Sequence, residues 1–189
     1  MTDRRAFFVK GEAEFRASYL SEPQNPYRMS GRSSGKERWE ETRRCLCEAI
    51  DQDGDFLDVG CANGLLLETL REWSPYELTP HGIDFVAELI PYARARHPGF
   101  EPNFHVANVW DWEPSRRYTH VRTNLEYIPE PDWPEYLRRV ASWGDRLIVC
   151  HYRNANEPVV EVAEVARRCG FDVAGTTQAP GVRAAWVDP

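Results

Sequence analysis

Short apolar segments alternate with helix-like segments along most of this sequence, from residue 55 to residue 187. The clearest apolar segment is 146–152 (RLIVCHY), and a nearly continuous run of this kind is typical of a strand covered on both faces of a sheet. Neighbouring parallel strands need a crossover connection, which is usually a helix. The alternation therefore predicts an α/β fold with a mainly parallel sheet.

The predicted elements follow one another in a regular order. Strands are expected at residues 55–60, 79–85, 103–108, 118–124, 146–152, 171–177 and 182–187, and helices at 65–73, 86–96, 132–143 and 157–169. Pro91 should kink the second of these helices or delay its start, because proline lacks the backbone N–H that a helix interior needs. Only a short turn joins the last two strands, so they must pair antiparallel. We therefore expect a seven-stranded, mainly parallel sheet with a closing antiparallel hairpin and helices on both faces.

The N-terminal part of the chain does not follow this alternation. Residues 1–35 are irregular in pattern, and within them 21–35 is rich in Pro, Ser and Gly, which predicts a loop. A helical pattern follows at residues 35–50. We therefore expect a lid-like, helical segment at residues 1–50 and an α/β domain at residues 51–189.

Composition narrows the class of protein. The net charge is -7 and the pI is near 5.3, which disfavours general binding to nucleic acid, because that depends on positive charge. No apolar run approaches the roughly 18 residues of a membrane-spanning helix, and the N-terminus does not resemble a secretory signal, so we expect a cytoplasmic protein without a membrane partner. The five cysteines lack C-x-x-C spacing and fit reduced thiols, and the spacing of His and carboxylate residues predicts no metal site.

The turn after the first predicted strand is the best candidate for a ligand site. It reads FLDVGCANG over residues 56–64, and ligands of such sheets bind beyond the carboxyl ends of the strands. Gly60 and Gly64 have no Cβ, so the backbone can turn tightly there and pass close to a ligand. The amides that open the next helix add partial positive charge.

The ends of the next two strands add the features of an adenosine site. Asp84 ends the second strand, where its carboxylate can accept hydrogen bonds from both hydroxyls of a ribose. Phe85 beside it offers a flat apolar face to a purine. Asn108, Val109 and Trp110 follow the third strand and can supply a side-chain amide and backbone amides to an adenine edge. The ordered set predicts a ligand that contains adenosine.

The glycine pattern indicates which kind of adenosine cofactor is expected. A dinucleotide fingerprint needs a third glycine, and here the bulky residues 65–67 follow Gly64. No lysine follows Lys36, so the lysine of a phosphate-binding P-loop is missing as well. The run from Asp58 to Gly64 (DVGCANG) instead resembles the first motif of the class I S-adenosylmethionine-dependent methyltransferases, in which an acidic residue leads into G-x-G-x-G.

This resemblance spans residues 35–189, and it implies a Rossmann-like domain that binds S-adenosylmethionine and releases S-adenosylhomocysteine. Residues 25–39 are similar to the leader of a bacterial branch of the family, which implies no particular substrate. The implied cofactor-binding residues are Asp58, Gly60, Cys61, Ala62, Gly64, Asp84, Phe85, Asn108, Val109, Trp110 and Asn124. Ala62 departs from the motif, which has glycine there, and we expect slight crowding at that point because alanine adds only a methyl group.

Methyl transfer from a sulfonium is an in-line displacement, so most of its catalysis is alignment of the acceptor with the methyl carbon. A base is needed only if the acceptor must lose a proton. His151, after the fifth strand, is the best single candidate because an unperturbed imidazole titrates near neutrality, and a structural histidine is the alternative. Tyr127 is the second candidate. It ends Asn124-Leu-Glu-Tyr127, which resembles the N-P-P-Y motif of methyltransferases that act on amino groups but lacks both prolines.

The expected function is therefore that of an enzyme that methylates a small-molecule acceptor. Two alternatives stay open. One is a non-catalytic regulatory protein that keeps the cofactor site, and the other is an RNA or protein methyltransferase, which the acidic balance disfavours. The sequence places no domain between the fifth strand and the hairpin, so residues 1–50 should recognise the acceptor. Arg32 and Lys36 are the candidates there for the methionine carboxylate.

Overall fold

A computed structural model describes residues 4–31, 35–153 and 158–189, so Arg32 and the first residue of the helix predicted at 157–169 lie outside the described residues. The helices are α1 (Arg4–Tyr19), α2 (Lys36–Arg43), α3 (Leu65–Trp73), α4 (Ile90–Arg96), α5 (Trp133–Ala141) and α6 (Val162–Arg168). The strands are β1 (Gly54–Val59), β2 (Leu78–Asp84), β3 (Phe104–Val106), β4 (Tyr118–Asn124), β5 (Gly144–Tyr152), β6 (Val173–Ala179) and β7 (Val182–Val187). None of the described helices is both long and apolar enough to cross a membrane.

The strands form one seven-stranded sheet in the order β3-β2-β1-β4-β5-β7-β6. Strands β1 to β5 pair in parallel, whereas β7 pairs antiparallel with both β5 and β6. The chain runs outward from β1 to β3 and then returns to β4 on the other side of β1. The topological switch point, where ligands bind in such sheets, therefore lies between β1 and β4. The predicted mainly parallel sheet with a closing hairpin is confirmed.

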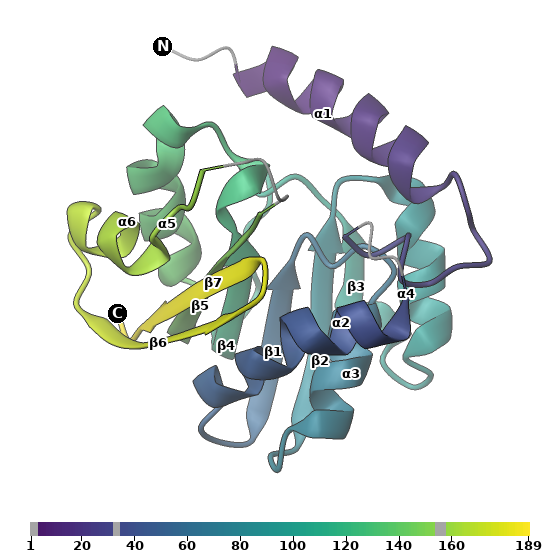
Figure 1. Ribbon diagram of the computed structural model, residues 1–189. Helices are drawn as coiled ribbons and strands as arrows, with labels where there is room; N and C mark the ends of the chain where they lie inside the picture. Colours follow the sequence, from purple (N-terminus) through teal and green to yellow (C-terminus); the bar gives the residue numbers. More distant parts are fainter. Residues whose placement is uncertain (1–3, 32–34, 154–157) are drawn as a thin grey trace.

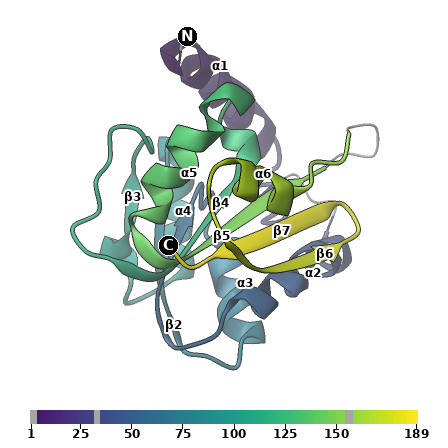
Figure 2. The ribbon, with the colours of Figure 1, turned by 90° about the vertical axis from the view of Figure 1, so that its left-hand side faces the viewer.

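Helices cover both faces of the sheet, as predicted (Figures 1 and 2). Successive side chains of a strand point to opposite faces, so neighbouring residues enter different layers. Leu57 and Val149 pack with α5 and α6 in one buried cluster, and Phe56 and Ile148 pack with α2, α3 and α4 in the other. The two apolar layers fix the sheet and so hold its carboxyl edge in place.

Helix α1 lies above the carboxyl ends of the parallel strands and belongs to neither layer (Figure 1). The rings of Phe8 and Phe15 contact the ring of Phe85 edge-on, with centroids 6.1 and 6.0 Å apart. Arg16 forms an ion pair with Glu88 at 2.9 Å. The helix therefore covers the edge of the sheet where the sequence predicts a ligand.

The N-terminal prediction needs a correction, because residues 1–35 were expected to be irregular and contain α1. Phe8, Phe15 and Tyr19 are separated by seven and four residues, which places them on one face of a helix. Charged residues and Gly11 interrupt the pattern, so it is weak in the sequence. Packing of that face on the rest of the protein stabilises the helix, as is general for short amphipathic helices.

Other boundaries also differ from the prediction: the strand predicted at 103–108 is the shorter β3, which ends at Val106, and the strand predicted at 171–177 is β6, which begins at Val173. The helix predicted at 35–50 is α-helical only to Arg43, and 3₁₀ turns follow at Arg44–Ala49. Leu46 and Ala49 in these turns are fully buried, so the tighter winding serves their packing in the core. Helix α6 begins only at Val162. Helix α4 begins late with Pro91 in its first turn, as predicted.

Candidate functional site

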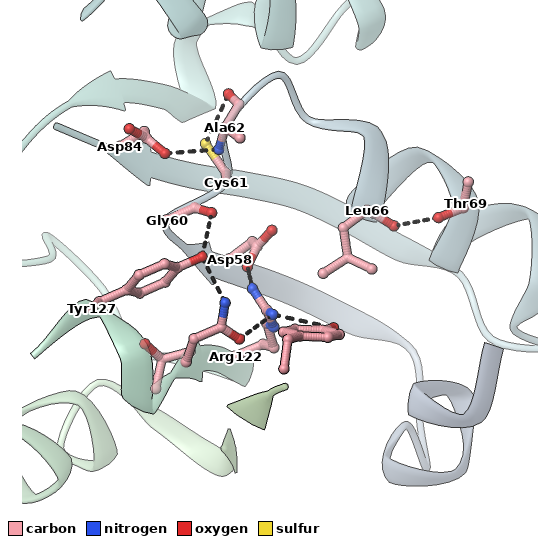
Figure 3. Close-up of polar contacts among 12 residues, drawn as sticks. Asp58, Gly60, Cys61, Ala62, Leu66, Thr69, Asp84, Arg122 and Tyr127 are labelled. Atoms are coloured by element: carbon pink, nitrogen blue, oxygen red, sulfur yellow. Dashed lines mark hydrogen bonds and ion pairs between the residues drawn. The ribbon is translucent and has the colours of Figure 1, made fainter. Parts of the chain in front are cut away.

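The turn after β1 adopts the left-handed conformation three times within five residues. Gly60 and Gly64 have φ angles of 80° and 75°, which glycine tolerates without steric cost. Ala62 has a φ of 48°, which is unusual for a residue with a Cβ. Its backbone N–H donates a hydrogen bond of 2.9 Å to Oδ2 of Asp84, and this bond holds the strained residue in place (Figure 3). This strain lies in the backbone, and the crowding expected between the Ala62 methyl group and a cofactor stays a prediction.

Gly60 brings the turn against a tyrosine from the other side of the switch point. A Cβ at Gly60 would lie 2.7 Å from the hydroxyl oxygen of Tyr127, which is too close for any other residue type. The Tyr127 hydroxyl donates to the Gly60 carbonyl at 3.2 Å and accepts a hydrogen bond of 2.8 Å from Nδ2 of Asn124 (Figure 3). Tyr127 and Asn124 are therefore fixed next to the glycine turn.

Two cavities open on the two sides of Gly60 and Tyr127. The first cavity has a volume of about 40 Å³, and the second has a volume of about 390 Å³. The first is lined by Phe8, Phe15, Tyr19, Val59, Gly60, Ile83, Asp84, Phe85, Val86, Ala107, Asn108, Val109, Tyr127 and Tyr136. The second is lined by Glu14, Phe15, Tyr19, Ser30, Gly31, Trp39, Arg43, Asp58, Gly60, Ala62, Leu66, Arg122, Asn124, Glu126, Tyr127 and Tyr152.

The first cavity contains the residues that the sequence assigned to ribose and purine. Asp84 is only 6% exposed, and its carboxylate oxygens accept hydrogen bonds from the backbone N–H groups of Ala62 and Val86 at 2.9 and 2.8 Å. Burial raises the pKa of Asp84 to about 6, and the two backbone bonds oppose this rise. Each oxygen keeps a lone pair for a further donor, so the carboxylate is able to bind ribose hydroxyls.

The second cavity contains a buried ion pair that joins β1 to β4 across the switch point. Nη1 of Arg122 donates to Oδ1 of Asp58 at 2.9 Å (Figure 3). Nη2 donates to the side-chain oxygen of Asn124 and, at 3.4 Å, to the hydroxyl of Tyr152. Burial opposes the charge on Arg122, but the Asp58 carboxylate prevails and holds its pKa well above the usual value. The pair therefore positions Asn124, which in turn holds Tyr127.

Four of the predicted site residues are not among the residues that line these two cavities. The thiol of Cys61 lies against Gly82, where a Cβ would be 2.6 Å from the sulfur. The carbonyl of Gly64 lies 3.0 Å from Nε2 of His97, and this contact links the start of α3 to the end of α4. Trp110 lines a neighbouring surface pocket with Val106. The fourth is His151, which lines a different cavity.

His151 lies on the opposite side of β5 from Tyr152 and lines a third cavity with Arg153, Gln178 and Arg183. In the strand register it stands opposite Arg183. Lys36 is exposed, lies outside the described cavity linings and pairs with Glu40 at 3.7 Å. Neither position brings its side chain to the glycine turn.

Several lining residues were not found from the sequence. Arg43 and Trp39 line the second cavity from α2, and Phe15 and Tyr19 line both cavities from α1. Arg122 was noted only as part of β4. The sequence does contain an indication of its role. An arginine in a strand that is otherwise buried is unusual, and it implies a buried acidic partner.

Comparison with known proteins places this site in a family. Residues 56–144 match the family model of a methyltransferase domain. The match covers the stretch from β1 to the start of β5 and indicates a methyltransferase domain there. No curated protein matches its sequence.

Solved structures of methyltransferases share the fold. One is the 1,6-didemethyltoxoflavin-N1-methyltransferase of Burkholderia thailandensis with bound 1,6-didemethyltoxoflavin and S-adenosylhomocysteine, at 16% identity and a TM-score of 0.69, over 100% of this chain and 92% of that one. A second is the N-methyltransferase NodS of Bradyrhizobium japonicum with S-adenosylhomocysteine, at 14% identity and a TM-score of 0.68, over 94% and 97% of the chains. A third is the magnesium protoporphyrin IX methyltransferase of Synechocystis with S-adenosylmethionine, at 17% identity and a TM-score of 0.65, over 94% and 96%. At these low sequence identities, the similarity to the three structures establishes a shared fold only.

Proposed function

We propose that this methyltransferase transfers a methyl group from S-adenosylmethionine to a small organic acceptor. The observation that carries the proposal is that two chemically different cavities meet at Gly60, one with a ribose-binding carboxylate and one with aromatic and charged walls. When bound, the cofactor supplies an electrophilic methyl group, whose carbon–sulfur bond breaks as the acceptor's electron pair bonds to carbon, leaving neutral S-adenosylhomocysteine. The rest of the catalysis is alignment by the protein.

The chemistry of the first cavity fits an adenosine. The Asp84 carboxylate is fixed by two backbone N–H groups and can accept from the ribose hydroxyls, and Phe85 and Val109 supply apolar surface for the purine. The space is too small as it stands, because small-molecule pockets have volumes of roughly 300–1,000 Å³. Phe8 and Phe15 fill the opening from α1. We infer that α1 moves away when the cofactor enters.

In the second cavity, Tyr127 serves as a positioning donor in this proposal. Burial raises the pKa of the Tyr127 phenol well above its usual value, although Arg122 opposes the rise. Near neutral pH the phenol is therefore protonated and donates to the Gly60 carbonyl. It orients the turn beside the reacting methyl group and does not act as a base. An acceptor that must lose a proton would release it to another group or to water.

A small acceptor is favoured by the size and character of the second cavity. About 390 Å³ accommodates a molecule of one or two rings, and the walls include Trp39, Tyr152, Tyr127 and Tyr19. Two of the structural neighbours named above are described as methyltransferases of ring compounds, namely 1,6-didemethyltoxoflavin and magnesium protoporphyrin IX. The net charge of -7 is unfavourable for an RNA substrate.

Transfer of labelled methyl groups is the test of this function. The purified protein would be incubated with S-adenosylmethionine labelled in its methyl group and, separately, with metabolite, RNA and protein extracts. Label in the metabolite pool is the expected result. Label in RNA or in protein would instead show that the acceptor is a macromolecule of that class. Label in none of them, together with binding of S-adenosylhomocysteine, would support the non-catalytic alternative.

A further inference from the structure

At the end of β5 and the start of β7, the sheet extends beyond the apolar layer formed with α5 and α6. Val149 and Ala185 stand opposite each other and pack in that layer. His151 and Arg183 are the next opposed pair on the same face, because side chains alternate along a strand. The third cavity, with a volume of about 460 Å³, is lined by this polar pair. Figure 2 shows α6 beside this part of the sheet.

Three strands place polar side chains in one row of the third cavity. Arg183 of β7 stands opposite His151 of β5 on one side and opposite Gln178 of β6 on the other. Opposed residues of neighbouring strands point to the same face of a sheet. Arg153 follows β5, and its backbone N–H donates to the Gly181 carbonyl in the turn between β6 and β7 at 2.9 Å. The backbone of the sheet therefore holds these side chains together.

Positive charge predominates in the lining of the third cavity. Arg153 and Arg183 line it, and none of its lining residues in the described parts of the chain is acidic. Glu161 approaches Arg183, but Nε and Oε1 are 3.9 Å apart and the Glu161 side chain is 60% exposed, so this ion pair is weak. Nη1 of Arg183 donates to the Val182 carbonyl at 3.1 Å. Its Nη2 group has no hydrogen-bond partner among the residues that the structure describes, so it is available to a ligand.

The other walls and the size of the third cavity suit a small organic molecule. Val159 and Val160 line it, and Val159 is 46% exposed, which leaves apolar surface for a ligand to cover. The volume lies within the range of roughly 300–1,000 Å³ that is usual for small-molecule sites. None of its described lining residues belongs to the two cavities beside Gly60. The third cavity is therefore separate from them, and its charge and apolar wall together match an organic anion.

We propose that the third cavity is a second ligand site, which binds a small aliphatic carboxylate or phosphate ester through Arg183 and Arg153. The inference goes beyond the proposed function, because these residues take no part in binding the cofactor. The guanidinium of Arg183 forms charge-assisted hydrogen bonds with the anionic group, and Gln178 beside it offers a further N–H donor. The hydrocarbon part of the ligand lies against Val159 and Val160.

Probes of similar shape that differ in charge test the site on the whole chain. Ligand-observed NMR would measure binding of 4-methylpentanoate, of its neutral amide 4-methylpentanamide, and of 3-methylbutyl phosphate. We expect at least one of the two anions to bind about tenfold more tightly than the amide, because its hydrogen bonds are charge-assisted. The anion that binds more tightly identifies the anionic group of the natural ligand.

Variants at the two arginines test which residues make the site. Arg183→Met should remove the preference for an anion, Arg183→Lys should keep part of it, and Arg153→Met should reduce it. Arg167→Met is the matched control, because Arg167 lies on α6 with a side chain that is 54% exposed, outside the described lining of the cavity. This control should keep the full preference.

Equal binding of the anions and the amide by the wild type would overturn the proposal. So would a preference that persists when both Arg183 and Arg153 are replaced by methionine in a folded protein. Equal affinity for inorganic phosphate and for the organic anions would remove the apolar wall from the site. All variants should bind S-adenosylhomocysteine as the wild type does, and a loss of that affinity in a folded variant would contradict the separation of the sites. Failure of the wild type to bind S-adenosylhomocysteine would overturn the proposed function and leave the anion site standing.

Discussion

The two cavities share Gly60 and Tyr127, but they hold their buried carboxylates in different ways. In the first cavity, Asp84 is bound by two backbone N–H groups. In the second, Asp58 is bound by the guanidinium of Arg122. Backbone donors are fixed by the fold and leave the carboxylate charge available to a ligand, whereas a guanidinium consumes that charge. In the function proposed above, the carboxylate of Asp84 is therefore the one available to a ligand, and that of Asp58 holds β1 to β4.

Breaking the ion pair of the second cavity should have the largest effect. Arg122→Met leaves Asp58 as a buried, uncompensated charge, and we expect a loss of about 3–5 kcal/mol in the free energy of unfolding. Urea denaturation would measure it. Adding Asp58→Asn should restore part of the stability, because the unpaired charge is then gone.

The matched control for Arg122 is Arg117→Met. Arg117 pairs with Asp145 at 3.0 Å, but both side chains are more than half exposed. Its loss should cost about 1–2 kcal/mol, since surface ion pairs contribute little and its hydrogen bonds to the carbonyls of Ser142 and Gly144 are also lost. Similar losses for the two arginine variants would contradict the structural role assigned to the buried pair.

Removing the carboxylate of the first cavity should affect binding more than stability. We expect Asp84→Ala to weaken binding of S-adenosylhomocysteine by about 1.5–3 kcal/mol, since it removes charge-assisted hydrogen bonds to the ribose. Calorimetry would measure the affinity. The exposed Asp172→Ala is the control and should bind as the wild type does. Unchanged affinity in folded Asp84→Ala would remove Asp84 from the cofactor site.

The pH dependence of binding should follow the carboxylate of the first cavity. The pKa of Asp84 is raised from 3.8 to about 6, so the folded protein binds more protons than the unfolded chain between these values. Its contribution to stability is therefore present at low pH and is lost as the pH rises through about 6. The affinity for the ligand should change with pH in the opposite direction, because ribose hydroxyls donate hydrogen bonds to the ionised carboxylate of Asp84.

We therefore expect the affinity for S-adenosylhomocysteine to fall by up to about tenfold for each pH unit below 6. Calorimetry across this range would measure it, and Asp84→Asn should flatten the profile. A wild-type profile that is already flat would mean that protonation of Asp84 does not control binding.

The smallest expected effect concerns the cover that both cavities share. Phe15 and Tyr19 of α1 line both of them, so α1 should open for the ligand and close over it. Limited proteolysis with trypsin should cut near Arg28 a few times more slowly once S-adenosylhomocysteine is bound. Cleavage of the core should not change. Equal rates with and without ligand would leave α1 as a fixed part of the wall.

Local sequence signals were sufficient for most of the sheet. The apolar segment at 146–152 lies within β5, because a strand buried on both faces is apolar along most of its length, and the segment predicted at 118–124 coincides with β4. The helix predicted at 65–73 coincides with α3, since its leucines recur at helical spacing and glycine ends the turn before it. The lining of the first cavity by Asp84 and Asn108 also follows from local order, because Asp84 ends β2 and Asn108 follows the end of β3 by two residues, at the same edge of the sheet.

The second cavity could not be derived in this way. Arg122 and Asp58 are 64 residues apart, and only the pairing of β4 with β1 brings them together. Arg43 resembles any other arginine of a polar helix until α2 packs on the core and brings the guanidinium against Tyr152. His151 shows the converse, because its place at the end of β5 is correct but alternation along the strand turns it to the other face.

The sequence by itself determined the α/β fold, the glycine turn and the strand ends that carry Asp84 and Asn108. These depend on residue type and on spacing within one strand–helix unit, which local patterns record. The tertiary structure alone decided that Tyr127 lies against Gly60, that α1 covers the site and that Arg43 is buried against Tyr152. Those features depend on which segments become neighbours and on how much water they exclude, and neither is a property of any single stretch of the chain.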